Sequence, residues 1–233
     1  MISRHLVLLH GALGAARQLD PLAEALRTTF RVHQLDFEGH AATPARHRPF
    51  RIQHFAENVL ELLERDEIES AAFFGYSMGG YVALYLAAER PELVENVATL
   101  GTKFRWDPAT AGREAGRLDP TTLRAKVPAF ADSLSSRHTL EGGWEGVLAR
   151  TAEFLRDLGD HPPLTDAALA RIRQPVRVIV GARDNTVTVD ESEDVARRLP
   201  HGSFTVLPDT PHPIEQVDVA RLSSVLRGVF GAD

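Results

Sequence analysis

The sequence predicts an α/β fold, a three-layer sandwich in which helices cover both faces of a mostly parallel sheet. Short apolar segments alternate with helical patterns along the chain, which is the arrangement that this architecture requires. The 233 residues suit one α/β domain with an inserted cap, and they are enough to bury a sizeable core. We expect the core of the domain at residues 1–102 and 174–233 and a helical cap at residues 103–173.

The first apolar strand leads into the loop His10–Gly14, whose sequence has the pattern H-G-x-x-G. Between a strand and a helix, this pattern supplies backbone amides at the base of an active site. We expect the amide of Ala12 to be one of the two donors that an oxyanion hole needs, with Leu13 as the alternative. His10 is expected to brace the loop through hydrogen bonds rather than to transfer protons.

The pentapeptide Gly75–Gly79 has the pattern G-x-S-x-G. The apolar run Ala71–Phe74 precedes it, and the helical pattern Gly80–Ala88 follows at once. In this context the motif predicts a nucleophile elbow, a sharp turn that exposes the hydroxyl of Ser77, and the amide of Met78 is the expected second oxyanion donor. The glycines would leave room where a Cβ would collide with the neighbouring strand and helix. The pentapeptide alone leaves open a turn of small residues without a catalytic role.

Two later strands lead to residues that could complete a catalytic triad with Ser77. The β-branched segment Pro175–Val180 leads to Asp184, at the carboxyl edge of the sheet, where open α/β folds place their ligands. The next segment, Gly202–Leu207, leads to His212, whose backbone is stiffened by a proline on either side. Serine, aspartate and histidine therefore follow one another in the chain order of the α/β-hydrolase triad.

Taken together, these motifs resemble those of the α/β-hydrolase fold family, and the resemblance extends from the first strand to the last helix. It is carried by residues 10–14, 36–40, 75–80, 181–184, 187 and 212. The resemblance implies that Ser77 is the nucleophile, His212 the base and Asp184 the acid, with no metal or organic cofactor. Many members continue the second motif as G-H-G-x-S, whereas this chain has two alanines at 41–42.

The resemblance also implies a trimmed sheet, because members of the family usually begin with one or two further strands. We expect about six strands, all parallel and joined by right-handed helical crossovers. They should lie at residues 5–10, 31–36, 70–75, 94–100, 175–181 and 203–207. The strand at 31–36 would then form an edge of the sheet, where Arg31, His33 and Gln34 would discourage pairing with another strand.

Asp209 is a competing acid, because it lies three residues before His212 and could reach it across the loop. We prefer Asp184, since the end of a strand is a rigid site and the resemblance points there. A structural alternative exists for Asp184 as well, because Asp-Asn pairs favour turns.

The segment 103–173 is longer than a plain crossover needs, and we expect it to form a cap over Ser77. The spacing of its apolar residues predicts helices at about 121–135, 144–158 and 166–172. Residues 103–118 show little periodicity.

A mostly apolar substrate pocket is expected between this cap and the sheet. The candidate substrate-binding residues are Leu13, Phe104, Trp106, Phe130 and Trp144. Each of the aromatic residues could instead pack the cap onto the sheet. Positive and negative side chains balance in the cap, so it offers no electrostatic attraction for a strongly anionic substrate.

The composition excludes several classes of protein. The chain has no cysteine, so a disulfide, a thiol nucleophile and a cysteine metal site are unavailable. Its net charge of −6 favours solubility and gives no reason to expect nucleic acid as a partner. No apolar stretch approaches the roughly 18 residues of a membrane span, and no signal peptide is visible. We expect a cytoplasmic protein that acts on a small molecule, with its oligomeric state left open.

The expected function is that of a serine hydrolase that cleaves a carboxylic ester or thioester of small to medium size through an acyl-enzyme. The same fold also serves carbon–carbon bond hydrolases, perhydrolases and lyases. A lyase of the kind found in menaquinone synthesis would need arginines in the pocket, for which Arg105, Arg113 and Arg117 are candidates. A small-molecule receptor with a slow triad is a further alternative. A haloalkane dehalogenase is disfavoured, because its nucleophile would be an aspartate at position 77.

Overall fold

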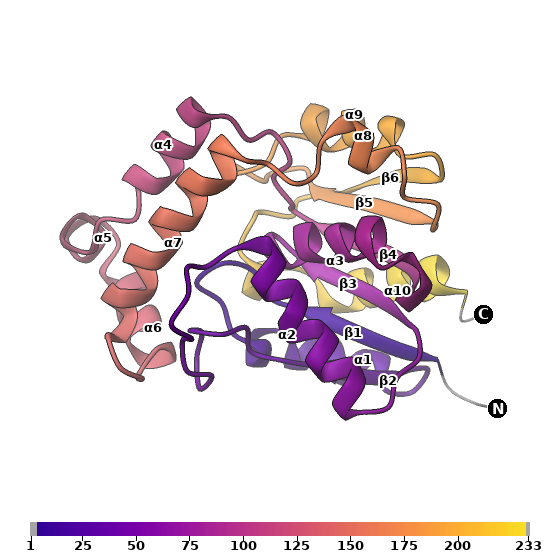
Figure 1. Cartoon of the computed structure of the whole chain (residues 1–233), viewed down its shortest axis with the longest axis horizontal. Helices are drawn as coiled ribbons and strands as arrows, with labels where there is room; N and C mark the ends of the chain where they lie inside the picture. The colour runs from indigo at the N-terminus through magenta and orange to yellow at the C-terminus, as the bar shows by residue number, and fades with distance from the viewer. Residues whose placement is uncertain (1–3, 232–233) are drawn as a thin grey trace.

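Six strands form one sheet in the computed structural model, which describes residues 4–231. They are β1 His5–Leu9, β2 Arg31–Gln34, β3 Ala71–Tyr76, β4 Val94–Leu100, β5 Val176–Gly181 and β6 Gly202–Leu207. The strands lie in the order β2-β1-β3-β4-β5-β6, and each neighbouring pair runs parallel (Figure 1). The prediction of a parallel sheet of about six strands is confirmed.

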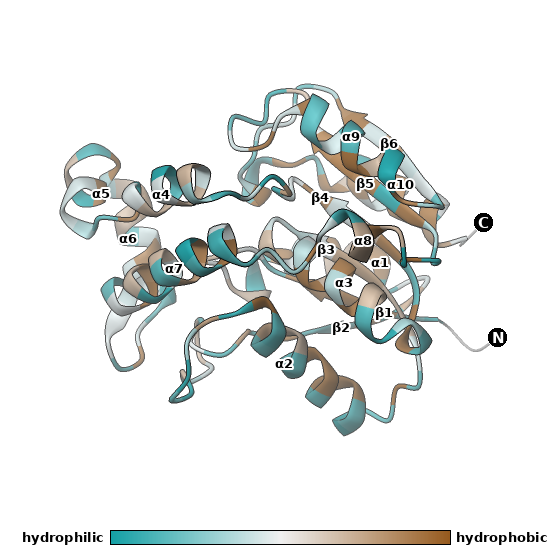
Figure 2. Ribbon diagram, turned by 45° about the horizontal axis from the view of Figure 1, so that its top comes forward, coloured by the Kyte–Doolittle hydropathy of each residue, from teal (hydrophilic) through white to brown (hydrophobic). Residues whose placement is uncertain are grey.

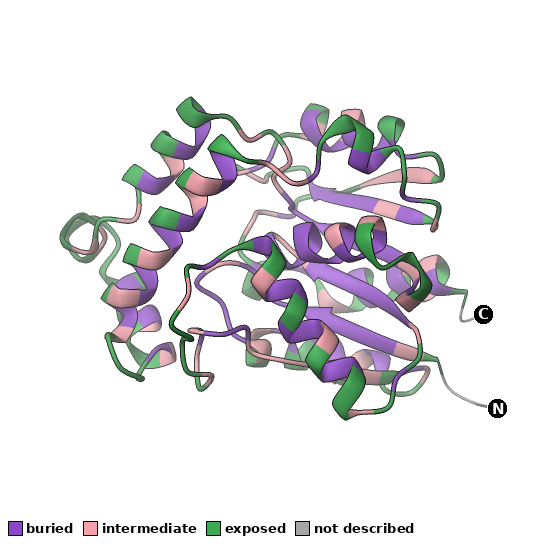
Figure 3. Ribbon diagram, in the orientation of Figure 1, coloured by how far each residue is buried: buried purple, intermediate pink, exposed green. Residues whose placement is uncertain are grey.

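The central strands are buried along nearly their whole length, as Figure 3 shows. A parallel strand that is covered on both faces needs apolar side chains in succession rather than in alternation. The runs Leu6–Leu9 and Ala71–Phe74 meet this requirement, and all their residues are buried. In β2, by contrast, Arg31 is exposed and His33 and Gln34 are half-buried, as expected for an edge of the sheet.

Helices cover both faces of the sheet. On one face lie α1 (Asp20–Leu26) and α10 (Val219–Phe230). On the other lie α2 (Ile52–Arg65), α3 (Met78–Glu89) and α9 (Val189–Arg198). Short 3-10 helices occupy Ala16–Leu19 (η1), Pro91–Leu93 (η2) and Ile214–Gln216 (η3). In Figure 2 the strands are mainly hydrophobic, while hydrophilic residues gather on outer helices such as α9.

Five further helices lie between β4 and β5. They are α4 Pro108–Gly116, α5 Pro120–Lys126, α6 Pro128–Arg137, α7 Gly143–Asp160 and α8 Asp166–Leu169. The first four, which we call the helical insertion (residues 108–160), stand together to one side of the sheet, with α4 alongside α7 (Figure 1). The short helix α8 returns to the sheet layer and packs against α3.

One expectation for this segment is wrong. The single helix expected at 121–135 is divided into α5 and α6, because Pro128 disfavours helical backbone at Val127 and lacks the amide needed to continue a helix. Residues 103–118, which show little periodicity, contain α4. Its start is marked by Asp107, whose carboxylate accepts a hydrogen bond from the amide of Thr110, and by a proline at the first helical position.

None of the helices within residues 4–231 combines the length and the apolar character that crossing a lipid bilayer requires.

Candidate active site

Ser77 lies on a sharp turn between β3 and α3. Its backbone has φ 52° and ψ −118°, a conformation that a residue with a side chain rarely adopts. Two hydrogen bonds hold the turn in place. The amide of Ser77 donates to the carbonyl of Leu100 over 2.8 Å, and the hydroxyl of Thr102 donates to the carbonyl of Ser77 over 2.9 Å. Backbone strain that the surrounding structure maintains in this way is typical of functional sites.

The glycines on either side of Ser77 are required by close backbone packing. A Cβ on Gly75 would lie 2.2 Å from the amide nitrogen of Gly80, and one on Gly79 would lie 2.3 Å from the carbonyl oxygen of Leu9. No side chain fits at such distances. The first turn of α3 can therefore approach β1 and β3 closely, as the G-x-S-x-G pattern predicts.

His212 and Asp184 form a directly bonded pair next to this turn. The distance between His212 Nδ1 and Asp184 Oδ2 is 2.7 Å. The other carboxylate oxygen of Asp184 accepts hydrogen bonds from the amides of Thr186 and Val187, over 2.8 and 2.9 Å. Because the carboxylate can only accept, the imidazole donates from Nδ1 and keeps Nε2 available for another partner. Asp209, the competing acid, is exposed and has a positive φ of 52°.

A cavity of about 340 Å³ brings these elements together, because both Ser77 and His212 line it. Its walls are mostly apolar side chains from the sheet layer and from the helical insertion. Of the residues predicted for substrate or oxyanion binding, Ala12, Leu13, Met78, Trp106 and Phe130 line this cavity.

Phe104 and Trp144 do not line the cavity, so the structure corrects their expected place. Phe104 stacks on Tyr81, with 6.3 Å between the ring centroids, and packs against the core. Trp144 is 4% exposed, and the guanidinium of Arg124 lies 5.0 Å from the centroid of its ring. Both aromatic residues therefore serve packing, the structural alternative that the sequence left open.

Arg117, one of the arginines considered for a lyase, also lines the cavity. The other lining residues were not among the candidate substrate-binding residues, namely Ile52, Tyr81, Lys103, Glu114, Leu118, Leu123, Thr151, Phe154, Leu155, Leu158 and Thr186. A signal for some of them exists in the sequence. Thr151, Phe154, Leu155 and Leu158 are spaced three and four residues apart, which places them on one face of α7. Tyr81 is four residues after Ser77, in the first turns of the helix that the elbow begins.

The loop after β1 passes directly beside Ser77, since a Cβ on Gly11 would lie 3.1 Å from that of Ser77. His10 braces this loop as expected. Its Nδ1 donates to the carbonyl of Gly11 over 2.8 Å, and its Nε2 accepts from the amide of Phe37 over 3.1 Å.

Leu13, in the same loop, has a positive φ of 60°. The helical insertion holds this residue in place through two hydrogen bonds. Its carbonyl accepts hydrogen bonds from Arg137 Nη1 over 2.8 Å and from His138 Nε2 over 2.9 Å. Both donors lie at the end of α6. The helical insertion is thereby bonded directly to the loop that lies beside Ser77.

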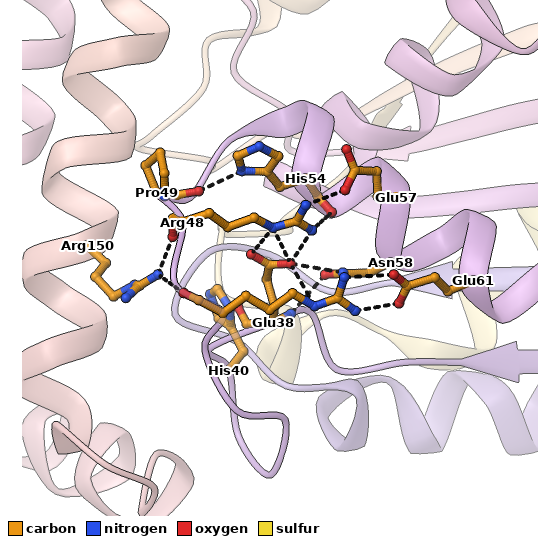
Figure 4. A network of polar contacts seen from close by, with 10 residues as sticks. Glu38, His40, Arg48, Pro49, His54, Glu57, Asn58, Glu61 and Arg150 are labelled. Atoms are coloured by element: carbon orange, nitrogen blue, oxygen red, sulfur yellow. Dashed lines mark hydrogen bonds and ion pairs between the residues drawn. The ribbon is translucent and has the colours of Figure 1, made fainter.

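A buried carboxylate organises the segment that follows β2. Glu38 accepts hydrogen bonds from Arg48 and from the side chain of Asn58, and its own amide donates to Asn58 Oδ1 over 2.9 Å (Figure 4). Arg150 of α7 donates to the carbonyls of Arg46 and Arg48. These bonds hold the segment that carries Phe37, the partner of His10, and attach it to the helical insertion.

Three buried histidines, His10, His40 and His138, lie together behind the loop after β1. Their ring centroids are 5.2 Å apart for His10 and His40 and 5.9 Å apart for His40 and His138. Burial lowers the pKa of His10 from its ordinary value of 6.5 to about 4, and it also lowers those of His40 and His138. His10 and His138 each accept a hydrogen bond from a backbone amide at one ring nitrogen, which only the neutral imidazole can do.

These shifts predict that stability falls as the solution is acidified. Below pH 6.5 the unfolded chain binds protons at these histidines, while the folded chain does not until its lowered pKa values are reached. The free energy of unfolding should therefore fall between pH 6.5 and about 4, by roughly 3 kcal/mol from His10 alone. Urea unfolding at pH 7 and pH 5 measures this. His40→Phe should weaken the pH dependence, exposed His201→Gln should not, and equal stability at both pH values would contradict the prediction.

Within residues 4–231, no three histidine or acidic side chains are grouped in the way that a metal site needs.

Comparisons with known proteins place this geometry in context. A sequence profile described as alpha/beta hydrolase fold matches residues 4–166. A 3-oxoadipate enol-lactonase of Acinetobacter baylyi is 31% identical over 190 residues, which cover 74% of this chain and 68% of that protein. A pimeloyl-[acyl-carrier protein] methyl ester esterase of Chromobacterium violaceum is 31% identical over 222 residues, with coverages of 88% and 83%. Among solved structures, the enol-lactonase of Burkholderia xenovorans LB400 matches with a TM-score of 0.80 at 21% identity, covering 98% of this chain and 92% of that one.

Proposed function

Since this chain belongs to the α/β-hydrolase fold family, we propose that it is a serine hydrolase that uses a triad of Ser77, His212 and Asp184. The observation that carries the proposal is that Ser77 and His212 line the same cavity. A strained turn presents Ser77, and a buried carboxylate orients the imidazole of His212. The substrate is a carboxylic ester or thioester of small to medium size.

In the proposed mechanism, Ser77 Oγ attacks the carbonyl carbon of the ester while His212 Nε2 takes its proton. Asp184 holds the imidazole in the required tautomer and stabilises the imidazolium that forms. The amides of Ala12 and Met78 bind the oxyanion, and Met78 is the first residue of α3, where the helix dipole favours negative charge. His212 then protonates the leaving group, and water activated by His212 releases the acyl group.

The helical insertion has two roles in this proposal. Phe130 and the lining face of α7, together with Trp106 just before the insertion, form the wall of the cavity that Ser77 also lines, and in this proposal residues 103–173 act as the cap. The end of α6 holds the carbonyl of Leu13 and so positions the neighbouring amide of Ala12 for the oxyanion. Electrostatic stabilisation of a transition state requires hydrogen-bond donors that a rigid scaffold holds in position before the reaction begins.

The apolar cavity and the named relatives support the choice of substrate. The two relatives at 31% identity are named for hydrolysis of a lactone and of a methyl ester, so we propose an uncharged ester group as the bond that is cleaved. The three arginines considered for a lyase have partners within the protein, although Arg117 lines the cavity. Arg113 Nη2 donates to Thr110 Oγ1 over 3.0 Å. Arg105 pairs with Asp194 over 3.3 Å, and Arg117 pairs with Glu114 over 2.9 Å and is 66% exposed.

Covalent labelling of the intact protein tests the proposal. A fluorophosphonate should add one adduct, which peptide mass spectrometry should locate at Ser77, and protein unfolded in urea should remain unlabelled. In parallel, p-nitrophenyl esters from acetyl to decanoyl should be hydrolysed, with the preferred chain length set by the cavity. A protein that is neither labelled nor active on any ester of the series would overturn the proposal.

A further inference from the structure

Thr151, in the middle of α7, has a hydroxyl group without a partner. The residue is 2% exposed, and its Oγ1 makes no hydrogen bond to any of residues 4–231. A threonine in a helix commonly bonds the carbonyl three or four residues earlier, which would satisfy this group. A buried hydroxyl that forgoes that bond destabilises the protein unless another molecule completes its hydrogen bonding.

The location of Thr151 indicates where that molecule would come from. Thr151 lines the same cavity as Ser77 and His212. Other buried polar side-chain atoms in the described chain also lack partners, but Thr151 is the one among them that lines this cavity. Tyr81 also lines the cavity, and its hydroxyl already accepts a hydrogen bond from the amide of Leu164.

The surroundings of Thr151 on α7 are apolar. Phe154, Leu155 and Leu158 share its face of the helix and line the cavity with it. This wall belongs to α7, which stands to one side of the sheet (Figure 1). Ser77, by contrast, directly follows β3 of the sheet. Thr151 and Ser77 therefore line the cavity from different layers of the fold.

The charged residues that line the cavity already have partners within the protein, and one pair, Arg117 and Glu114, lies in the cavity wall itself. Lys103 Nζ donates to the carbonyl of Thr186 over 3.1 Å and lies 4.0 Å from Glu191 Oε2. Arg117 is paired with Glu114. A carboxylate at Thr151 would be buried with a single neutral donor and no free counter-ion, which is costly. A neutral oxygen suits the position.

We propose that Thr151 determines specificity by binding a neutral oxygen-bearing group, such as a carbonyl, ether or hydroxyl, that the substrate carries beyond its scissile ester. This inference rests on the proposed ester hydrolysis and deepens it. A site with a buried hydrogen-bonding group discriminates against an analogue that lacks the matching atom, because the group is then left unpaired.

Paired esters of equal length test the inference. The probes are p-nitrophenyl heptanoate and its 5-oxo and 6-oxo derivatives, and the measured quantity is the ratio of kcat/KM for an oxo ester to that for the plain ester. Thr151→Val, which keeps the shape and removes the hydroxyl, should lower this ratio about tenfold for at least one oxo ester. Thr151→Ser, which keeps the hydroxyl, should preserve it. A ratio that is the same in wild type and Thr151→Val overturns the inference.

The stability of the variant is an independent measurement. Without ligand, Thr151→Val should raise the urea midpoint, because it removes an unsatisfied buried hydroxyl. A lowered midpoint would mean that the hydroxyl is satisfied within the protein, which also overturns the inference.

Failure of the proposed function is distinguishable from failure of this inference. If wild type hydrolyses none of the p-nitrophenyl esters and is not labelled by the fluorophosphonate, the proposed function fails. The thermal shifts produced by octane-2,7-dione and octan-2-one then test Thr151 by binding alone. A preference for the dione that Thr151→Val removes supports the site, and equal shifts in both proteins overturn it.

Discussion

Ser77→Ala is expected to lower kcat for the best p-nitrophenyl ester by on the order of 10⁶-fold. The reason is that His212 and the oxyanion donors act on a nucleophile that this variant no longer has. Stopped assays over hours, with enzyme at high concentration, measure the residual rate. Folding should be retained, because the two hydrogen bonds that hold the turn use backbone atoms of residue 77.

The matched control is Ser135→Ala, which removes an exposed hydroxyl in α6 and should leave kcat unchanged. If Ser77→Ala keeps its full ester hydrolysis while the fold is intact, Ser77 is not the nucleophile and the triad assignment is wrong.

Asp184→Asn should lower kcat by about 10⁴-fold. The activity is expected to fall because the two carboxylate oxygens of Asp184 have different partners. The oxygen bonded to the amides of Thr186 and Val187 must remain an acceptor, so the asparagine would turn its NH₂ group toward His212 Nδ1. The imidazole would then accept at Nδ1 and carry its proton on Nε2, where it cannot take the proton of the nucleophile.

Asp209→Asn is the matched comparison, because it makes the same chemical change three residues before His212. Asp209 is exposed, so its variant should retain kcat within a small factor. A large loss in Asp209→Asn together with near-normal rates in Asp184→Asn would reverse the assignment of the acid. The kcat values of both variants should be measured over pH 6 to 9.

Much of the core was predictable because its signals are local. The runs Leu6–Leu9 and Ala71–Phe74 are apolar without alternation, and a parallel strand covered on both faces is the structure that such runs favour. The elbow was predictable for a similar reason. Its glycines act within a few residues of Ser77, and the collisions that they avoid are with the strand and helix on either side.

The helical insertion was predicted less well. Pro128 divides a pattern that, by spacing alone, predicts one helix, and α4 has too few apolar residues to show a period. Phe104 and Trp144 were reasonable candidates for the cavity because aromatic side chains serve packing and binding alike. Which of the two occurs depends on partners such as Tyr81 and Arg124, which are distant from them in the sequence.

The sequence by itself therefore determined the α/β architecture, the parallel sheet and the serine, aspartate and histidine that we propose as the triad. Only the tertiary structure decided that His212 bonds Asp184, that Thr151 lines the cavity, and that its hydroxyl has no partner among residues 4–231. The physical reason is that strands, turns and motifs arise from residues close together in the chain. A cavity and its hydrogen bonds are formed by residues that are distant in the sequence and come into contact only in the folded protein. No periodic pattern in the sequence predicts which of these residues will be in contact.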